Sequence, residues 1–171
     1  MPDAAVSRRA LLRWVAVGGL GTLVLGGLGF AIAPLVTGEA TGFGGSVDAG
    51  TVDNIAPGTV QRFPAGKFWL SRYAEPALGN RDVLLALYWK CAHLGCTVGW
   101  EPTLKLGGAA GLFRCPCHGS VYARSGQNIG GPTLRPLDIM AIRLDGRRIW
   151  VETGLISQRV QYDPQQATVI I

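Results

Sequence analysis

The Cys and His residues of this chain all fall in two short segments. Residues 91–96 read C-A-H-L-G-C and residues 115–120 read C-P-C-H-G-S, and together they hold all four Cys and both His of the 171 residues. Thiolates and imidazoles are the side chains that bind soft and borderline metal ions. Gly95 and Gly119 allow the backbone of each segment to turn tightly around a bound group. The sequence therefore predicts a metal centre that is held by two loops.

The number of donors narrows the kind of metal centre. A [2Fe-2S] centre in which two His replace two Cys on one iron needs one Cys and one His from each segment, which leaves one Cys over in each. Four Cys allow three disulfide pairings, and the spacing equally allows Cys115 and Cys117 to exchange roles. A structural zinc site of Cys/His type is the alternative, although six candidate ligands exceed what one four-coordinate zinc takes.

These two segments resemble the cluster-binding boxes of Rieske iron-sulfur proteins, specifically those of the quinol-oxidising cytochrome bc and b6f branch. The run Gly119-Ser120-Val121-Tyr122 resembles the G-S-x-Y run after the second box, and Gly131-Pro132 resembles the proline loop that covers the cluster. The resemblance implies one [2Fe-2S] cluster with Cys91 and Cys115 on one iron and His93 and His118 on the other. It also implies a Cys96–Cys117 disulfide, and hydrogen bonds from Ser120 to a bridging sulfide and from Tyr122 to a ligating Cys sulfur.

Strand patterns dominate the part of the chain that carries these boxes. Residues 67–73, 83–89 and 112–114 are rich in apolar and aromatic residues, and Asp145-Gly146 predicts a hairpin turn between strands at 139–144 and 147–152. The stretch from Glu101 to Gly111 is predicted as a surface loop or short helix, and residues from about Gly154 onward give no prediction. We expect an all-β fold, a small antiparallel sandwich or partly closed barrel with two cluster-binding loops at one end.

The first 46 residues predict export and a membrane anchor. Arg8-Arg9 in a stub at 1–13 resembles a twin-arginine signal, and an uncharged run follows it, which predicts a transmembrane helix at 14–36. The positive charges before this helix place the N-terminus in the cytoplasm. A Gly-rich hinge is predicted at 37–46 and the head at 47–171. The alternative is a signal peptide cleaved near Ala31-Ile32-Ala33, which Pro34 directly after the cut disfavours.

The charge of the chain gives no indication of nucleic-acid binding. The net charge is +5, but the N-terminal stub holds part of the excess and the basic residues of the head are scattered rather than clustered. Both His lie in the metal-binding boxes, so no Ser/His/Asp triad is available.

The resemblance implies a function in electron transfer at the bacterial cytoplasmic membrane. The chain is expected to be the iron-sulfur subunit of a quinol:cytochrome c (or plastocyanin) oxidoreductase, with cytochrome b and a c-type cytochrome as partners. His93 and His118 would be its catalytic residues, because a ligating imidazole can accept a hydrogen bond from quinol through its second nitrogen. Two alternatives are the Rieske small subunit of an arsenite-oxidase-type periplasmic enzyme and a zinc-stabilised binding module without a redox role.

Overall fold

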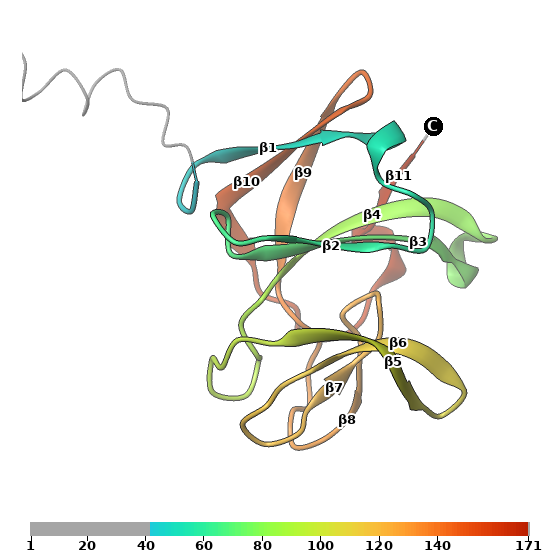
Figure 1. The fold of residues 1–171 in the computed structure, drawn as a ribbon, viewed down its shortest axis with the longest axis vertical. Coiled ribbons are helices and arrows are strands. Elements are labelled where there is room, and N and C mark those ends of the chain that lie inside the picture. The colour runs from blue at the N-terminus through green and yellow to red at the C-terminus, as the bar shows by residue number, and fades with distance from the viewer. Residues whose placement is uncertain (1–41, 171) are drawn as a thin grey trace, which may run out of the picture. The chain divides into compact units, whose positions relative to one another are not determined.

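A computed structural model describes residues 42–170 of the chain (Figure 1). The twin-arginine stub, the predicted transmembrane helix and the first residues of the predicted hinge lie outside the described residues. The only helices between residues 42 and 170 are three short 3₁₀ turns, and none of them could span a membrane. These turns are η1 (Val52–Asn54), η2 (Pro76–Leu78) and η3 (Pro164–Gln166).

The described part of the chain consists of two antiparallel sheets, as predicted. The larger sheet has the strand order β1 (Ser46–Thr51), β10 (Arg148–Ser157), β9 (Ile139–Asp145), β4 (Arg81–Tyr88), β3 (Phe68–Glu75) and β2 (Val60–Phe63), and β11 (Thr168–Val169) also pairs with β4. The smaller sheet has the order β5 (Gly99–Leu106), β6 (Ala109–Arg114), β7 (Val121–Tyr122) and β8 (Asn128–Gly130). Figure 1 shows the small sheet below the large one.

Strand β4 belongs to both hydrophobic cores of the domain. Its apolar residues are continuous from Val83 to Leu87, which is the pattern of a strand buried on both faces. Leu84 and Ala86 pack into a core enclosed by the large sheet, whereas the side chains at 83, 85 and 87 pack into a second core. This second core includes Val98, Phe113 and Tyr122 of the cluster-loop end, so it joins the large sheet to the small one. The first box therefore begins shortly after a strand that is buried on both faces.

The predicted loop or short helix at 101–111 is wrong. These residues form most of the β5–β6 hairpin, whose turn is Gly107-Gly108 with φ of 58° and 84°. Two consecutive residues with positive φ make the tight turn that matches strand twist, and Gly is favoured at both positions. The polar/apolar alternation of Thr103-Leu104-Lys105-Leu106 is a strand pattern. The Gly pair that follows it favoured the loop prediction instead.

The β9–β10 hairpin is confirmed with a shift of one residue in its turn. Asp145 pairs with Arg148 at the end of the ladder, so the connecting residues are Gly146 and Arg147 rather than Asp145 and Gly146. Gly146 has φ of 56° and stands at the first turn position, where two-residue hairpin turns require positive φ.

The last residues of the predicted hinge are bonded to strand β10. The Thr153 hydroxyl accepts a hydrogen bond from the Gly44 N–H at 2.9 Å, and it lies 2.7 Å from the Gly42 carbonyl and 2.8 Å from the Gly45 carbonyl. Ser46 already belongs to β1, which pairs with β10. Any pivot in the predicted hinge would therefore have to lie before Gly42.

Candidate metal centre

The two Cys/His boxes fold into loops with the same backbone hydrogen bonds. In the first loop, between β4 and β5, the Cys91 N–H donates to the Cys96 carbonyl and the Gly95 N–H donates back to the Cys91 carbonyl, at 2.8 and 2.9 Å. In the second loop, between β6 and β7, the Cys115 N–H donates to the Ser120 carbonyl at 2.8 Å and the Gly119 N–H donates to the Cys115 carbonyl at 3.1 Å.

Both loops depend on a glycine at the same place in the turn. Gly95 and Gly119 have φ of 78° and 73°, a left-handed conformation that other residues adopt at a cost. Each box therefore presents its first Cys and its His from an equivalent turn. The two boxes therefore resemble each other in backbone conformation as well as in sequence.

A disulfide between Cys96 and Cys117 joins the two loops. This is the pairing that the family resemblance implied. The sulfur atoms of Cys96, Cys115 and Cys117 all lie within 4.8 Å of one another, but two of these three are consumed by the disulfide and cannot serve as thiolate ligands. Cys91 and Cys115 remain as the two free thiols of the described chain.

The four remaining donors differ in burial according to their chemical type. The two free Cys are buried, with 3% and 2% of their surface exposed, whereas His93 and His118 are both exposed. The two imidazole rings have centroids 5.0 Å apart and are nearly perpendicular, at 89°. Two sulfur donors inside and two nitrogen donors at the surface fit the ligand set of a [2Fe-2S] centre with different ligands on its two irons. A single zinc ion would require all four donors to meet at one point.

The surroundings of Cys91 favour its thiolate. Burial raises the pKa of the Cys91 thiol, but hydrogen bonds from the Tyr122 hydroxyl and from the backbone N–H of His93 outweigh this effect, so the pKa lies below the usual value. Burial raises the pKa of Cys115, and the neighbouring Cys91 adds to that rise. Burial raises the pKa of Tyr122 to about 12, and Tyr122 therefore keeps its proton and remains a hydrogen-bond donor at neutral pH.

Three buried hydroxyl groups form a connected cluster beside the Cys91 sulfur, which two of them contact. The predicted residues Ser120 and Tyr122 are both present, and the Tyr122 oxygen lies 3.1 Å from the Cys91 sulfur. The third hydroxyl belongs to Thr133, which is 4% exposed and was missed in the sequence because it occurs in a run of loop residues. Its position directly after Gly131-Pro132 was the available signal.

The proline loop, residues 131–136, packs closely on the second cluster loop. A Cβ atom added to Gly131 would lie 2.5 Å from the Ser120 Cα and 2.8 Å from the Gly119 carbonyl oxygen, and Gly131 has φ of 87°. Any side chain at 131 would therefore push the two loops apart. Pro132 follows at the surface, so Gly131 provides the close approach and the predicted role of this pair as a cover stays a prediction.

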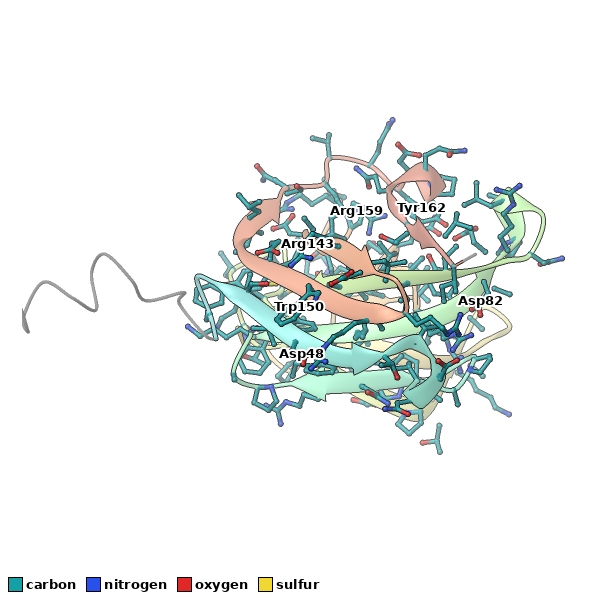
Figure 2. All side chains as sticks on the ribbon, turned by 90° about the horizontal axis from the view of Figure 1, so that it is seen from above. Asp48, Asp82, Arg143, Trp150, Arg159 and Tyr162 are labelled. Carbon is teal, nitrogen blue, oxygen red and sulfur yellow. A yellow bond between two sulfur atoms is a disulfide. The ribbon has the colours of Figure 1, made fainter. Side chains whose placement is uncertain are left out.

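The C-terminal tail, for which no structure was predicted, holds the far end of the proline loop. Arg159 is buried, and its guanidinium donates to the Ser125 carbonyl and to the Gln166 side chain, each at 2.8 Å. Its backbone N–H donates to the Asp138 carboxylate at 3.1 Å, and the same carboxylate pairs with Arg135. Figure 2 shows Arg159 beside Tyr162, over whose ring its guanidinium lies.

A comparison with protein-family models matches residues 47–142 to the Rieske [2Fe-2S] domain. The chain belongs to the Rieske family. A Rieske protein carries a [2Fe-2S] cluster, which agrees with the donor set described above. The boxes, the disulfide and the proline loop of this Rieske protein all lie within the matched residues.

The relatives of this Rieske protein include iron-sulfur subunits of cytochrome b6-f complexes and of a menaquinol:cytochrome c reductase. It is 32% identical over 145 residues to the menaquinol:cytochrome c reductase iron-sulfur subunit of Bacillus subtilis, which covers 78% of this chain and 83% of that protein. It is 42% identical over 67 residues to the chloroplastic cytochrome b6-f complex iron-sulfur subunit of Bigelowiella natans, but this match covers 37% of this chain and only 24% of that protein. Among solved structures, a chain of a hyperthermophilic respiratory complex III is 27% identical, with a TM-score of 0.45 and coverage of 79% of this chain and 97% of that one.

Proposed function

We propose that this protein is the electron-transfer subunit of a membrane-bound quinol:cytochrome c oxidoreductase. The observation that carries the proposal is the match to the Bacillus subtilis menaquinol:cytochrome c reductase subunit, because it extends along 78% of this chain, well beyond the cluster boxes. Cytochrome b and a c-type cytochrome are the proposed partners, and the bacterial cytoplasmic membrane is the proposed location. No observation supports the arsenite-oxidase-type or the zinc-stabilised alternative.

The proposed ligands are the four donors that remain after the disulfide is formed. Cys91 and Cys115 would hold the buried iron, and His93 and His118 would hold the exposed one. The bound cluster supplies reversible uptake of one electron. Because the loop backbones and the disulfide fix all four donors, the domain offers a preformed site rather than one that is assembled on binding.

The exposed histidines are the proposed contact with quinol. Each imidazole has two nitrogens, so a His that ligates through one nitrogen can accept a hydrogen bond from a quinol hydroxyl through the other. The imidazole nitrogen would then take the quinol proton, and the bound cluster would supply the acceptor for one electron. His93 and His118 are the exposed members of the donor set, so they can meet a substrate bound in a partner subunit without any opening of the Rieske domain.

An EPR-monitored redox titration of membranes that contain the full-length chain tests this function. We expect a Rieske-type signal that appears on reduction, and we expect cytochrome b hemes to purify with the protein. Addition of menaquinol should reduce the cluster, and a c-type cytochrome should reoxidise it. A Rieske signal that menaquinol, ubiquinol and plastoquinol all fail to produce, in a preparation without cytochrome b, would refute the proposed function.

The hydroxyls of Ser120 and Tyr122 are expected to raise the reduction potential of the cluster. A hydrogen bond to sulfur is stronger when the cluster carries the extra electron, so each bond favours reduction. If the difference is about 1 kcal/mol per bond, Ser120→Ala and Tyr122→Phe should each lower the midpoint potential by about 40 mV. Redox titration of the two variants measures the effect. Midpoints equal to that of the unsubstituted protein would show that these hydroxyls do not bond to the cluster.

A further inference from the structure

Thr133 lies at the centre of the cluster of three buried hydroxyls, from Ser120, Tyr122 and Thr133, beside Cys91. Its oxygen is 2.8 Å from the Ser120 oxygen, 3.2 Å from the Tyr122 oxygen and 3.9 Å from the Cys91 sulfur. All three hydroxyls are almost completely buried, so water does not compete for these bonds. Each of the three has a single proton to donate.

The single protons restrict how the hydroxyls can be connected. A ligating Cys91 has no proton, so Tyr122 must be the donor in the 3.1 Å contact between them. The Thr133 proton can then go to the Ser120 oxygen, its nearest partner in the described chain. In that arrangement the Ser120 proton is left free for an acceptor outside the group. In the reverse arrangement, Ser120 donates its proton to the Thr133 oxygen and has none left for another acceptor.

The strength of the bonds decides between these two arrangements. Sulfur ligands of an iron-sulfur cluster carry negative charge, and hydrogen bonds to charged acceptors are about twice as strong as those between neutral groups. The arrangement that leaves the Ser120 proton free for a cluster sulfur is therefore favoured. A Thr133 proton donated to the Ser120 oxygen also polarises Ser120 and makes it a better donor, by about 10–30% per bond.

The backbone around Thr133 is fixed at both ends. On one side Gly131 packs against the Ser120 Cα with no room for a side chain. On the other side Asp138 is held by the Arg135 side chain and by the backbone N–H of Arg159. The hydroxyl of Thr133 is therefore held at a set distance from Ser120. A residue that positions another group has to be held in this way.

We propose that Thr133 is a positioning residue that raises the reduction potential of the cluster by directing the Ser120 proton toward it. This proposal rests on the proposed ligation by Cys91 and on the predicted bond from Ser120. Thr133 acts through Ser120, its nearest hydroxyl partner at 2.8 Å, and is itself not a ligand, because the ligands of a Rieske centre are Cys sulfurs and His nitrogens.

Redox titration of Thr133→Val in the full-length protein tests the proposal. Val has nearly the same shape but no hydroxyl, so we expect the equilibrium constant for reduction to fall about two- to fivefold, which is roughly 20–40 mV at 59 mV per tenfold change. Thr133→Ser keeps the hydroxyl and should retain the original midpoint. In a Ser120→Ala/Tyr122→Phe background, Thr133→Val should have no further effect, since the Ser120 hydroxyl through which it acts is gone. Thr133→Ala serves as a second hydroxyl-free variant if the Val protein does not fold.

Three results would overturn the proposal. These are an unchanged midpoint in Thr133→Val and Thr133→Ala, an equal shift in Thr133→Ser, and a full shift that persists in the Ser120→Ala/Tyr122→Phe background. The EPR spectrum of the unsubstituted protein distinguishes these three results from failure of the proposed function. A chain without a Rieske signal would contradict the proposed ligation itself. A normal Rieske signal with an insensitive midpoint would overturn only the role of Thr133.

Discussion

Replacement of His93 or His118 with Ala is expected to abolish the Rieske EPR signal while the β domain stays folded. Each His is expected to supply one of two nitrogen ligands to the same iron, so either substitution leaves that iron short of a ligand. Both side chains are exposed, and their removal takes little from the hydrophobic cores. EPR of the dithionite-reduced protein, together with far-UV circular dichroism, measures the two parts of this expectation.

Leu94→Ala is a matched control for the His93 substitution. Leu94 is the next residue in the same loop and is 70% exposed, so this variant perturbs the loop without removing a donor. We expect it to retain the Rieske signal. A normal signal in both His variants would show that the iron has other ligands, whereas loss of the signal in Leu94→Ala would mean that any change in this loop releases the cluster.

Loss of the Cys96–Cys117 disulfide is expected to destabilise the domain by about 2–5 kcal/mol, the usual range for small exported domains. The bond closes a segment of 21 residues and ties together the two loops that carry the ligands. Cys96→Ser, Cys117→Ser and the double variant should lower the free energy of unfolding by similar amounts, because either single change already breaks the bond. Urea denaturation followed by circular dichroism gives these free energies.

The disulfide variants should still assemble a cluster of the same type. Neither Cys is among the proposed ligands, so the Rieske signal is expected to persist and to be lost at lower temperature or denaturant concentration. Substitution of the free thiol Cys115 by Ser is the contrasting variant and should remove the signal. If Cys117→Ser removed the signal and Cys115→Ser retained it, the roles of these two residues would be exchanged.

The metal-binding boxes were predictable because their chemistry is local. A Cys or His that binds metal is recognisable by type and spacing, and the tight turns at Gly95 and Gly119 need only their own few residues. The strands β3, β4, β9 and β10 were predictable for a similar reason, since hydrophobic patterning is read along a single segment. Spacing alone did not distinguish Cys115 from Cys117, and the family resemblance supplied that choice.

The remaining features depend on contacts between distant segments. Thr133 contacts Ser120 only because the proline loop packs on the second box. Arg159 contacts the Ser125 carbonyl only because the C-terminal tail returns to this end of the domain. A Thr in a loop and an Arg in a polar tail are ordinary surface residues by composition. Only the fold shows that both are buried. The β5–β6 hairpin was not predicted, because its turn at Gly107-Gly108 lies in the stretch for which a surface loop or short helix was expected.

Strand β4 gives the domain a single unit of cooperativity. One face of this strand fills the core inside the large sheet, and the other face fills the core that supports the small sheet and Tyr122. The metal-binding end therefore cannot come apart as a subdomain while the large sheet remains intact, because exposing one side of β4 removes packing from the other. Amide protons of β4 should therefore exchange with solvent only when the whole domain unfolds, which native-state hydrogen exchange measures.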